Sequence, residues 1–213
     1  AEQLAFLEQL AAIVARENGR LRERRALASR LIERLIAGNL EQAGKAQLHS
    51  LARRYRVEGD LLREAAVRRD LLARIDIIPM SLALAQAVNE SGWGTSRFAR
   101  EGNNLFGIWT YDESKGIVPK GRAPGATHLV RKFDSLEESV RYYLHNLNSH
   151  PAYSELRDLR AQARARGEQP TGMALAAGLT RYSAKGEVYV RLIRDMIQRY
   201  RLAALASRAA PSA

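Results

Sequence analysis

Residues 79–96 of the sequence are PMSLALAQAVNESGWGTS, and they carry the strongest structural signal in the chain. A proline opens the segment, a mostly apolar run follows, and Ser91-Gly92 closes it. Proline is favoured in the first turn of a helix, and glycine is favoured where a helix ends. Because the run is apolar almost all round, we expect a helix over residues 79–89 that is buried at the centre of the fold.

The sequence on both sides of this segment is also helical in pattern. Alanine, leucine and arginine dominate, β-branched residues are sparse, and apolar side chains recur every three or four positions. The predicted helices cover residues 4–36, 40–55, 61–75, 96–100, 134–148, 152–165, 171–178 and 188–205. Residues 105–133 alone resemble strand and loop, with a Gly/Pro-rich tip and a strand at 127–133. The predicted fold is mainly α (α+β), with a small β-hairpin flap.

The composition excludes several classes of function. The chain of 213 residues has no cysteine, so disulfides, thiolate metal sites and a cysteine nucleophile are excluded. The four histidines are scattered and form no chelating pattern, and we expect neither a metal nor a cofactor. No apolar run approaches the roughly 20 residues that a membrane span requires.

The net charge of +11 lies on the flanks of the chain. Residues 1–75 carry a net charge of +5, residues 76–153 are neutral, and residues 154–213 carry +6. A basic exterior suits any polyanion, including nucleic acid and an anionic cell wall. The sequence has no helix-turn-helix, zinc-finger or RNA-recognition signature, so no nucleic acid partner is expected.

Glu90 is the carboxyl group best placed for acid catalysis. It lies at the C-terminal end of the apolar helix, where burial and the negative end of the helix dipole both favour a raised pKa. Such a group can remain protonated and donate its proton to a leaving oxygen. The alternative, an ordinary surface glutamate, is less favoured because Gly92, Trp93 and Gly94 follow, and these residues allow a ligand to approach closely.

Aromatic and amide side chains are concentrated after Glu90. Sugars present C–H faces and rings of hydroxyls, and they therefore require aromatic walls and amide donors. The candidate substrate-binding residues are Trp93, Asn103, Phe106, Trp109, Tyr111 and Tyr189. Each can equally belong to the core, which is the preferred interpretation for Phe106 and Tyr189, whereas ligand contact is preferred for Trp109 and Tyr111. Tyr182 is expected in a turn, where its hydroxyl is available.

Residues 81–96 together with NNLFGI at 103–108 resemble the endo-β-N-acetylglucosaminidases of glycoside hydrolase family 73. The Bax-type branch of that family also resembles this chain at Trp109, at residues 132–135 and at Tyr182 and Tyr189. The resemblance covers residues 70–202. It implies a lysozyme-like helical domain at 71–205, with residues 1–70 as an N-terminal helical extension packed on it and 206–213 as a flexible tail.

The resemblance also implies a function. The substrate would be peptidoglycan glycan strands, cleaved at the β-1,4 bond after N-acetylglucosamine. Glu90 would be the proton donor, and Tyr182 would line the reaction centre. A periplasmic or cell-envelope location is implied, with any signal peptide removed or trimmed.

A second catalytic acid is harder to assign. Residues 116–133 of the predicted flap contain no acidic residue, which leaves Asp112 and Glu113 at its entrance. Glu113 is the candidate second catalytic residue, although both acids can be plain loop charges. We slightly prefer a substrate-assisted scheme, in which the 2-acetamido group of the sugar attacks the anomeric carbon.

Three other functions remain open from the sequence. A lytic transglycosylase also uses one catalytic glutamate and would release 1,6-anhydro-muramyl ends. A non-catalytic cell-wall-binding module would release no product at all. A nucleic-acid binder would be retained on DNA in a strongly salt-dependent way.

Overall fold

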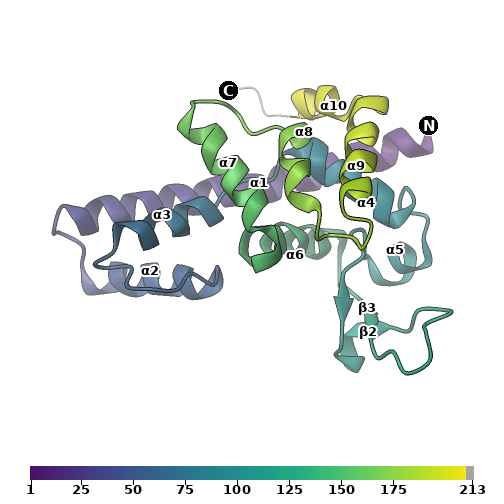
Figure 1. The fold of residues 1–213 in the computed structure, drawn as a ribbon, viewed down its shortest axis with the longest axis horizontal. Helices are drawn as coiled ribbons and strands as arrows, with labels where there is room; N and C mark the ends of the chain where they lie inside the picture. Colours follow the sequence, from purple (N-terminus) through teal and green to yellow (C-terminus); the bar gives the residue numbers. More distant parts are fainter. Residues whose placement is uncertain (210–213) are drawn as a thin grey trace. The chain divides into compact units, whose positions relative to one another are not determined.

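The computed structural model describes residues 1–209, and the chain divides into two compact units (Figure 1). The first unit comprises residues 1–17, 80–143 and 191–213, and the second comprises 18–79 and 144–190. Both units therefore contain sequence from either side of residue 70, the boundary expected between the extension and the helical domain.

Helices dominate both units, as the sequence predicts. The α-helices are α1 (Glu2–Ile36), α2 (Gln42–Arg54), α3 (Ala65–Arg74), α4 (Met80–Ser91), α5 (Arg97–Gly102), α6 (Leu136–Ser149), α7 (Ser154–Ala165), α8 (Gly172–Leu175), α9 (Glu187–Arg199) and α10 (Leu202–Ala209). Short 3-10 helices cover η1 (Glu113–Lys115), η2 (Pro151–Tyr153) and η3 (Ala176–Leu179). The strands are β1 (Trp109–Thr110), β2 (Gly116–Ile117) and β3 (Leu129–Arg131).

Helix α4 forms the core of the first unit. Every residue from Ser81 to Val88 is buried, which confirms the central helix predicted from the apolar run. Helix α10 packs against α4, and Phe106 stacks on Tyr143 of α6 with ring centroids 3.9 Å apart. The buried Tyr143 hydroxyl donates a hydrogen bond to the Gln86 side-chain oxygen, so the one amide in the middle of α4 has a polar partner.

The sheet of the first unit has three antiparallel strands in the order β1-β3-β2. Trp109 pairs with Val130 and Ile117 pairs with the same residue from the other side. The predicted strand at 127–133 is thus the central strand, and the flap is a small sheet and not a two-stranded hairpin. Leu129, Val130 and Ile117 are buried, which anchors the sheet to the rest of the unit.

The second unit has its hydrophobic core between the second half of α1, α2 and α3. Its buried residues are Ala28, Leu31, Ile32, Leu40, Leu48, Ala52, Tyr55, Leu61, Val67, Leu71 and Ile75. The three helices lie side by side in Figure 1, with α2 and α3 packed along α1. Gly19 does not interrupt α1, which runs for 35 residues.

Arginines satisfy the carbonyl groups where α3 ends. Arg160 of α7 is fully buried and donates to the carbonyl oxygens of Ala73 and Ile77 at 2.8 and 3.0 Å. Its third short bond, at 2.7 Å, goes to the Asn148 side-chain oxygen. The buried Asn18 of α1 exchanges two hydrogen bonds with the backbone of Ile78. These contacts fix the chain immediately before α4 begins.

Several predicted boundaries need correction. The helix predicted over 188–205 is two helices, because Arg201 adopts a left-handed conformation with φ of 50° that no α-helix contains. Residues 206–209 of the expected flexible tail belong to α10, and residues 210–213 lie outside the described residues. The helix predicted from residue 134 begins as α6 with Ser135 as its N-cap, since Ser135 Oγ accepts from the Glu138 amide, and the Glu138 carboxylate accepts from the Asp134 amide.

Candidate active site

Glu90 occupies the last turn of α4 and is half-buried, whereas the residues that precede it as far as Ser81 are mostly fully buried. The side-chain amide of Asn89 donates to Glu90 Oε1 at 3.3 Å. A half-buried carboxyl at the end of a buried helix can reach a ligand while most of its surroundings stay rigid. Glu90 thus lies at the C-terminal end of the buried helix, as expected from the sequence, and its role as the acid stays a prediction.

The loop that faces Glu90 is organised by one buried amide, Asn104. Its side-chain nitrogen donates to the carbonyl oxygens of Ile108 and Arg131 at 2.8 and 2.9 Å. Its side-chain oxygen accepts from the backbone amides of Phe106 and Ile108 at 3.3 and 3.1 Å. All of these groups are on one loop or on β3, so Asn104 fixes the loop to the sheet.

Gly107 is the residue of this loop that lies against the candidate acid. Its φ is +67°, and a Cβ added there would lie 3.0 Å from Glu90 Oε2. Only glycine adopts this conformation readily and also leaves the carboxyl oxygen room. The backbone of the NNLFGI segment thus forms one wall beside Glu90.

The turn after α4 is unusual because three successive residues have positive φ. Gly92, Trp93 and Gly94 have φ values of 56°, 61° and 75°. The Trp93 ring meets Tyr200 edge to face, with centroids 4.8 Å apart. A Cβ on Gly94 would lie 2.6 Å from the Phe6 ring of α1. In this structure Trp93 packs on a neighbouring ring and holds a left-handed turn, and it is half-buried.

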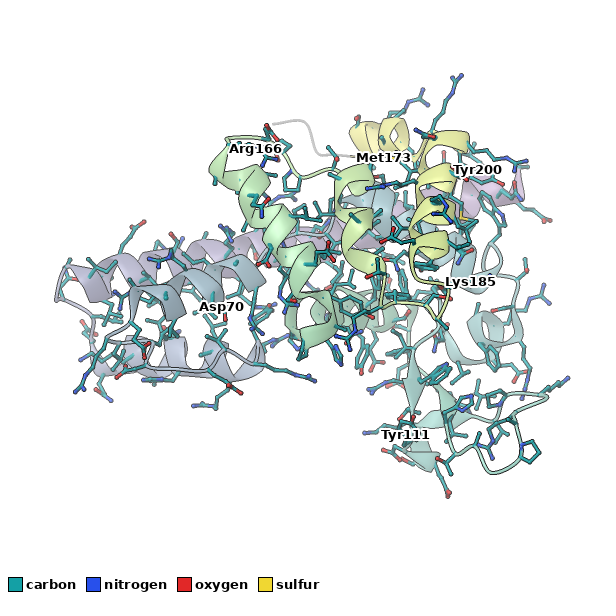
Figure 2. All side chains as sticks on the ribbon, in the orientation of Figure 1. Asp70, Tyr111, Arg166, Met173, Lys185 and Tyr200 are labelled. Atoms are coloured by element: carbon teal, nitrogen blue, oxygen red, sulfur yellow. The ribbon has the colours of Figure 1, made fainter. Side chains whose placement is uncertain are left out.

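Exposed aromatic rings are found on the sheet instead. Trp109 is 58% exposed and Tyr111 is 72% exposed, and Figure 2 shows Tyr111 among the side chains of the strands. The Trp109 ring stacks on His128 with centroids 4.2 Å apart and planes inclined by 21°. Two exposed rings separated by one residue form an aromatic surface that suits the C–H faces of a sugar.

Three of the predicted substrate-binding residues have packing or backbone partners. Phe106 has no exposed surface and Tyr189 has 1%, so neither ring can present a face to a ligand in this structure. Their burial agrees with the core packing that was preferred for both residues from the sequence. Asn103 caps α5 in a left-handed conformation and donates to the Phe133 carbonyl oxygen at 2.9 Å. Its amide serves to connect α5 to the end of β3.

Tyr182 belongs to the second unit, in the turn between η3 and α9, as expected. Its ring stacks on Tyr189 with planes inclined by 6°, and Tyr153 lies beyond it with centroids 5.8 Å apart. Tyr182 is half-buried whereas its two neighbours are buried. The stack holds the Tyr182 ring in place by its faces.

The two acids at the entrance to the flap have different environments. Asp112 caps η1 by accepting from the Ser114 amide and hydroxyl at 3.0 and 2.6 Å, and it lies 3.3 Å from Lys115 Nζ. These hydrogen bonds and then the Lys115 charge lower the pKa of Asp112. Asp112 is therefore a structural carboxylate. Glu113, the first residue of η1, is exposed and is the remaining candidate for a second acid.

Gly107 was not predicted from the sequence to be a site residue. The signal for it was present, because a glycine that follows a buried aromatic in NNLFGI indicates a backbone position that a side chain would obstruct. Asn104 also belongs to NNLFGI, and its burial and its four hydrogen bonds to backbone show a structural role.

Comparison with known proteins identifies the family of this chain. The family model described as "Glucosaminidase: Mannosyl-glycoprotein endo-beta-N-acetylglucosaminidase" matches residues 65–202. The chain belongs to the glucosaminidase family. The protein Bax of Escherichia coli strain K12 is 37% identical over 197 residues, which cover 91% of this chain and 68% of Bax. The resemblance to Bax-type glucosaminidases is thereby confirmed, and the matched region contains Glu90, Gly107 and Tyr182.

No solved structure matches this chain significantly. Within residues 1–209, no helix has both the length and the apolar character needed to cross a membrane. The same residues contain no group of three or more histidine, aspartate or glutamate side chains that could hold a metal ion.

Proposed function

We propose that this chain hydrolyses the β-1,4 bond after N-acetylglucosamine in peptidoglycan, with Glu90 as the general acid. The observation that best supports this proposal is the position of Glu90. It is half-buried at the end of the buried helix α4, with the backbone of Gly107 against its carboxyl oxygen. Family membership supports a glycosidase, and a glycosidase requires such an acid. With peptidoglycan as the proposed substrate, the proposed location is the cell envelope, which is the periplasm in a Gram-negative cell.

The proposed reaction needs one carboxyl group. Glu90 donates its proton to the glycosidic oxygen as the bond from that oxygen to the anomeric carbon breaks. The carbonyl oxygen of the substrate's own 2-acetamido group forms a bond to the anomeric carbon at the same time. That bond closes a five-membered oxazoline ring on the sugar. Water then attacks the anomeric carbon and opens the oxazoline ring, and the proton that the water releases returns to Glu90. Tyr182 is proposed to orient the acetamido group through its hydroxyl.

The exposed rings of the sheet supply the proposed contact with the glycan. Trp109 and Tyr111 together offer an aromatic surface in the same unit as Glu90. The Trp109 ring is held on one face by His128, so it is already ordered before a sugar binds. Ordering a side chain in advance lowers the entropy that binding costs.

The test of this function is mass spectrometry of muropeptides released from purified peptidoglycan. The intact chain is expected to release fragments with reducing N-acetylglucosamine ends, and the Glu90→Gln variant is expected to release none. Fragments with 1,6-anhydro-muramyl ends would show a lytic transglycosylase instead. If the intact chain binds peptidoglycan and releases nothing, the protein is a wall-binding module and the proposal is wrong.

The close approach of Gly107 to Glu90 gives a second prediction. Gly107→Ala is expected to lower kcat by about tenfold or more, because the new methyl group displaces the carboxyl oxygen from its position. It should also cost about 1 kcal/mol in the free energy of unfolding, because its φ is positive. Turnover on soluble peptidoglycan fragments and urea denaturation measure the two effects.

Gly121→Ala is the matched control for this substitution. Gly121 has a similar φ of +73°, and a Cβ added there would meet nothing within 4 Å. The control should lose the same stability and keep its kcat. Equal losses of kcat in both variants would show that backbone strain alone is responsible and that Gly107 does not position Glu90.

A further inference from the structure

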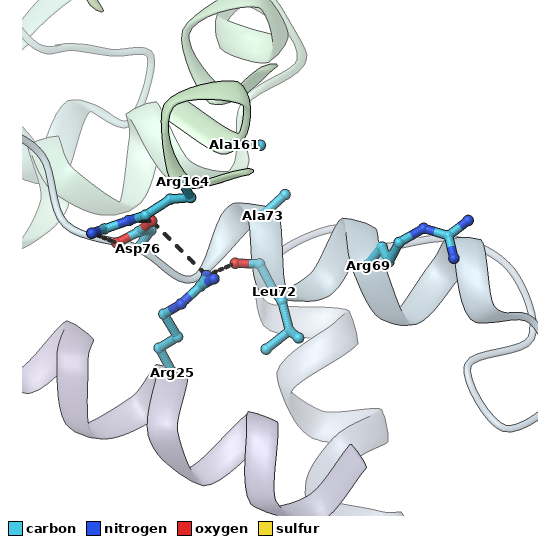
Figure 3. A pocket seen from close by; sticks show the side chains of 7 residues that line it. All are labelled: Arg25, Arg69, Leu72, Ala73, Asp76, Ala161 and Arg164. Carbon is cyan, nitrogen blue, oxygen red and sulfur yellow. Dashed lines mark hydrogen bonds and ion pairs between the residues drawn. The ribbon is translucent and has the colours of Figure 1, made fainter. Parts of the chain in front are cut away.

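A pocket in the second unit lies where α1, α3 and α7 meet, and it contains an excess of positive charge. Its cavity of about 230 Å³ is lined by Arg25, Arg69, Leu72, Ala73, Asp76, Ala161 and Arg164 (Figure 3). All of these residues belong to the second unit, which does not contain Glu90. None of the lining residues is a candidate catalytic or substrate-binding residue.

One carboxylate faces three arginines in this region. Asp76 is 4% exposed, and Arg164 binds it through two hydrogen bonds of 2.8 and 3.0 Å. Arg25 and Arg160 each place a nitrogen 3.9 Å from Asp76 Oδ2. The group of four side chains thus carries a net charge of about +2, and Arg69 adds a further positive charge at the edge of the cavity.

The positive charge in this group is incompletely satisfied. Arg160 is fully buried, and its Nε has no hydrogen-bond partner among the described residues. Burial is the main cause that lowers the pKa of Arg160 to about 10, with the charges of Arg157, Arg25 and Arg164 adding to it and Asp76 opposing it. Arg69 is exposed and has no hydrogen bond or ion pair within residues 1–209. Arg160 does not line the cavity, so an anion there would be bound by the lining arginines Arg25, Arg69 and Arg164, which together with Asp76 carry a net charge of about +2.

The rest of the lining defines the class of anion. Leu72, Ala73 and Ala161 supply aliphatic surface, and the Arg69 guanidinium supplies donors for two oxygens, whereas Arg164 already binds Asp76. We propose that the pocket binds a small carboxylate with a short aliphatic body. Two sources have this chemistry, a free short-chain acid and the alanine-like C-terminal end of a peptide. Binding would join α1, α3 and α7 and raise the thermal stability of the protein.

The experiment follows the arginine Nε–H signals of the full chain by NMR during titration. The probes are propionate, N-acetylalanine, inorganic phosphate and the neutral propionamide. We expect saturable shifts with the two carboxylates, weaker binding of phosphate and no binding of propionamide. Tighter binding of N-acetylalanine identifies the peptide end as the source, and tighter binding of propionate identifies the free acid.

Arg69→Gln is expected to raise the dissociation constant for the carboxylates by about threefold to tenfold. The side chain is exposed and unpaired, so the melting temperature without ligand should not change. Arg53→Gln, an equally exposed arginine on α2 outside the pocket, is the matched control and should bind as the intact chain does.

Other results would overturn the proposal. Shifts that do not saturate, or phosphate binding as tight as that of the carboxylates, would show a general response to ions. Equal affinity in Arg69→Gln and the intact chain would likewise exclude this pocket. The Glu90→Gln variant should bind carboxylates normally, so failure of the proposed hydrolysis and failure of this site can be distinguished.

Discussion

Replacing Glu90 with glutamine is expected to lower the rate of peptidoglycan hydrolysis by about a hundredfold to ten-thousandfold. Glutamine has nearly the same shape, but it cannot donate a proton to the leaving oxygen, and general acid catalysis contributes a factor of that size. Because Glu90 lies half-buried at the end of α4, the neutral amide should not destabilise the fold. The measurement is the initial rate of release of reducing ends from purified peptidoglycan.

Glu113→Gln is the matched comparison in the same unit. In the substrate-assisted scheme the acetamido group replaces the second carboxylate, so this variant should retain activity within about threefold of the intact chain. A loss comparable to that of Glu90→Gln would contradict the scheme and make Glu113 the second catalytic acid. Both variants should bind peptidoglycan as the intact chain does, which a sedimentation assay can check.

Much of the fold was predictable because its strongest signals are local. The apolar run before Glu90 specified a buried helix, and Ser135 with Glu138 specified the start of α6. The position of Glu90 followed from its place in that run. Neither prediction required knowledge of distant contacts.

The remaining features depend on contacts between distant segments. The hydrogen bonds of Asn104 reach β3, some 27 positions further along the chain, and no local pattern distinguishes such an amide from a sugar donor. Trp93 likewise is a residue type that commonly lines ligand sites. Only the contact with Tyr200, which is distant in the sequence, shows what packs against its ring. The break between α9 and α10 was missed because an arginine with positive φ has no sequence signature.

The arginine cluster illustrates the same limit. A sequence rich in arginine predicts a basic surface, whereas Arg160 has no exposed surface and donates to the end of α3. The residues that meet around Asp76 come from positions 25, 160 and 164, which are far apart in the chain. Their meeting depends on how α1, α3 and α7 pack.

The substitution with the largest expected effect on stability is Asp76→Asn, which should lower the free energy of unfolding by about 3 to 5 kcal/mol at pH 7. It removes the carboxylate that faces Arg25, Arg160 and Arg164, and unpaired buried charge costs that much. Asp70→Asn is the matched control, because Asp70 is paired with Arg74 at 3.1 Å but is 44% exposed. An exposed pair contributes less than about 1 kcal/mol. Urea denaturation of both variants measures the difference.

The effect of Asp76→Asn should also depend on pH in a direction that the structure fixes. Burial acts to raise the pKa of Asp76, but the hydrogen bonds from Arg164 and the charges of Arg160 and Arg25 outweigh it, so the pKa is lowered. The pKa of Asp76 in the folded chain lies below its value in the unfolded chain, which is about 3.9 for aspartate. The ionised carboxylate therefore contributes its full stabilisation at pH values above the unfolded-state pKa. This stability is lost as the pH falls through the folded-state pKa. The difference in the free energy of unfolding between the intact chain and Asp76→Asn should therefore be constant from pH 7 to 5 and become smaller below pH 4. A difference that grew on acidification would contradict the proposal that the ionised Asp76 is stabilised by these arginines.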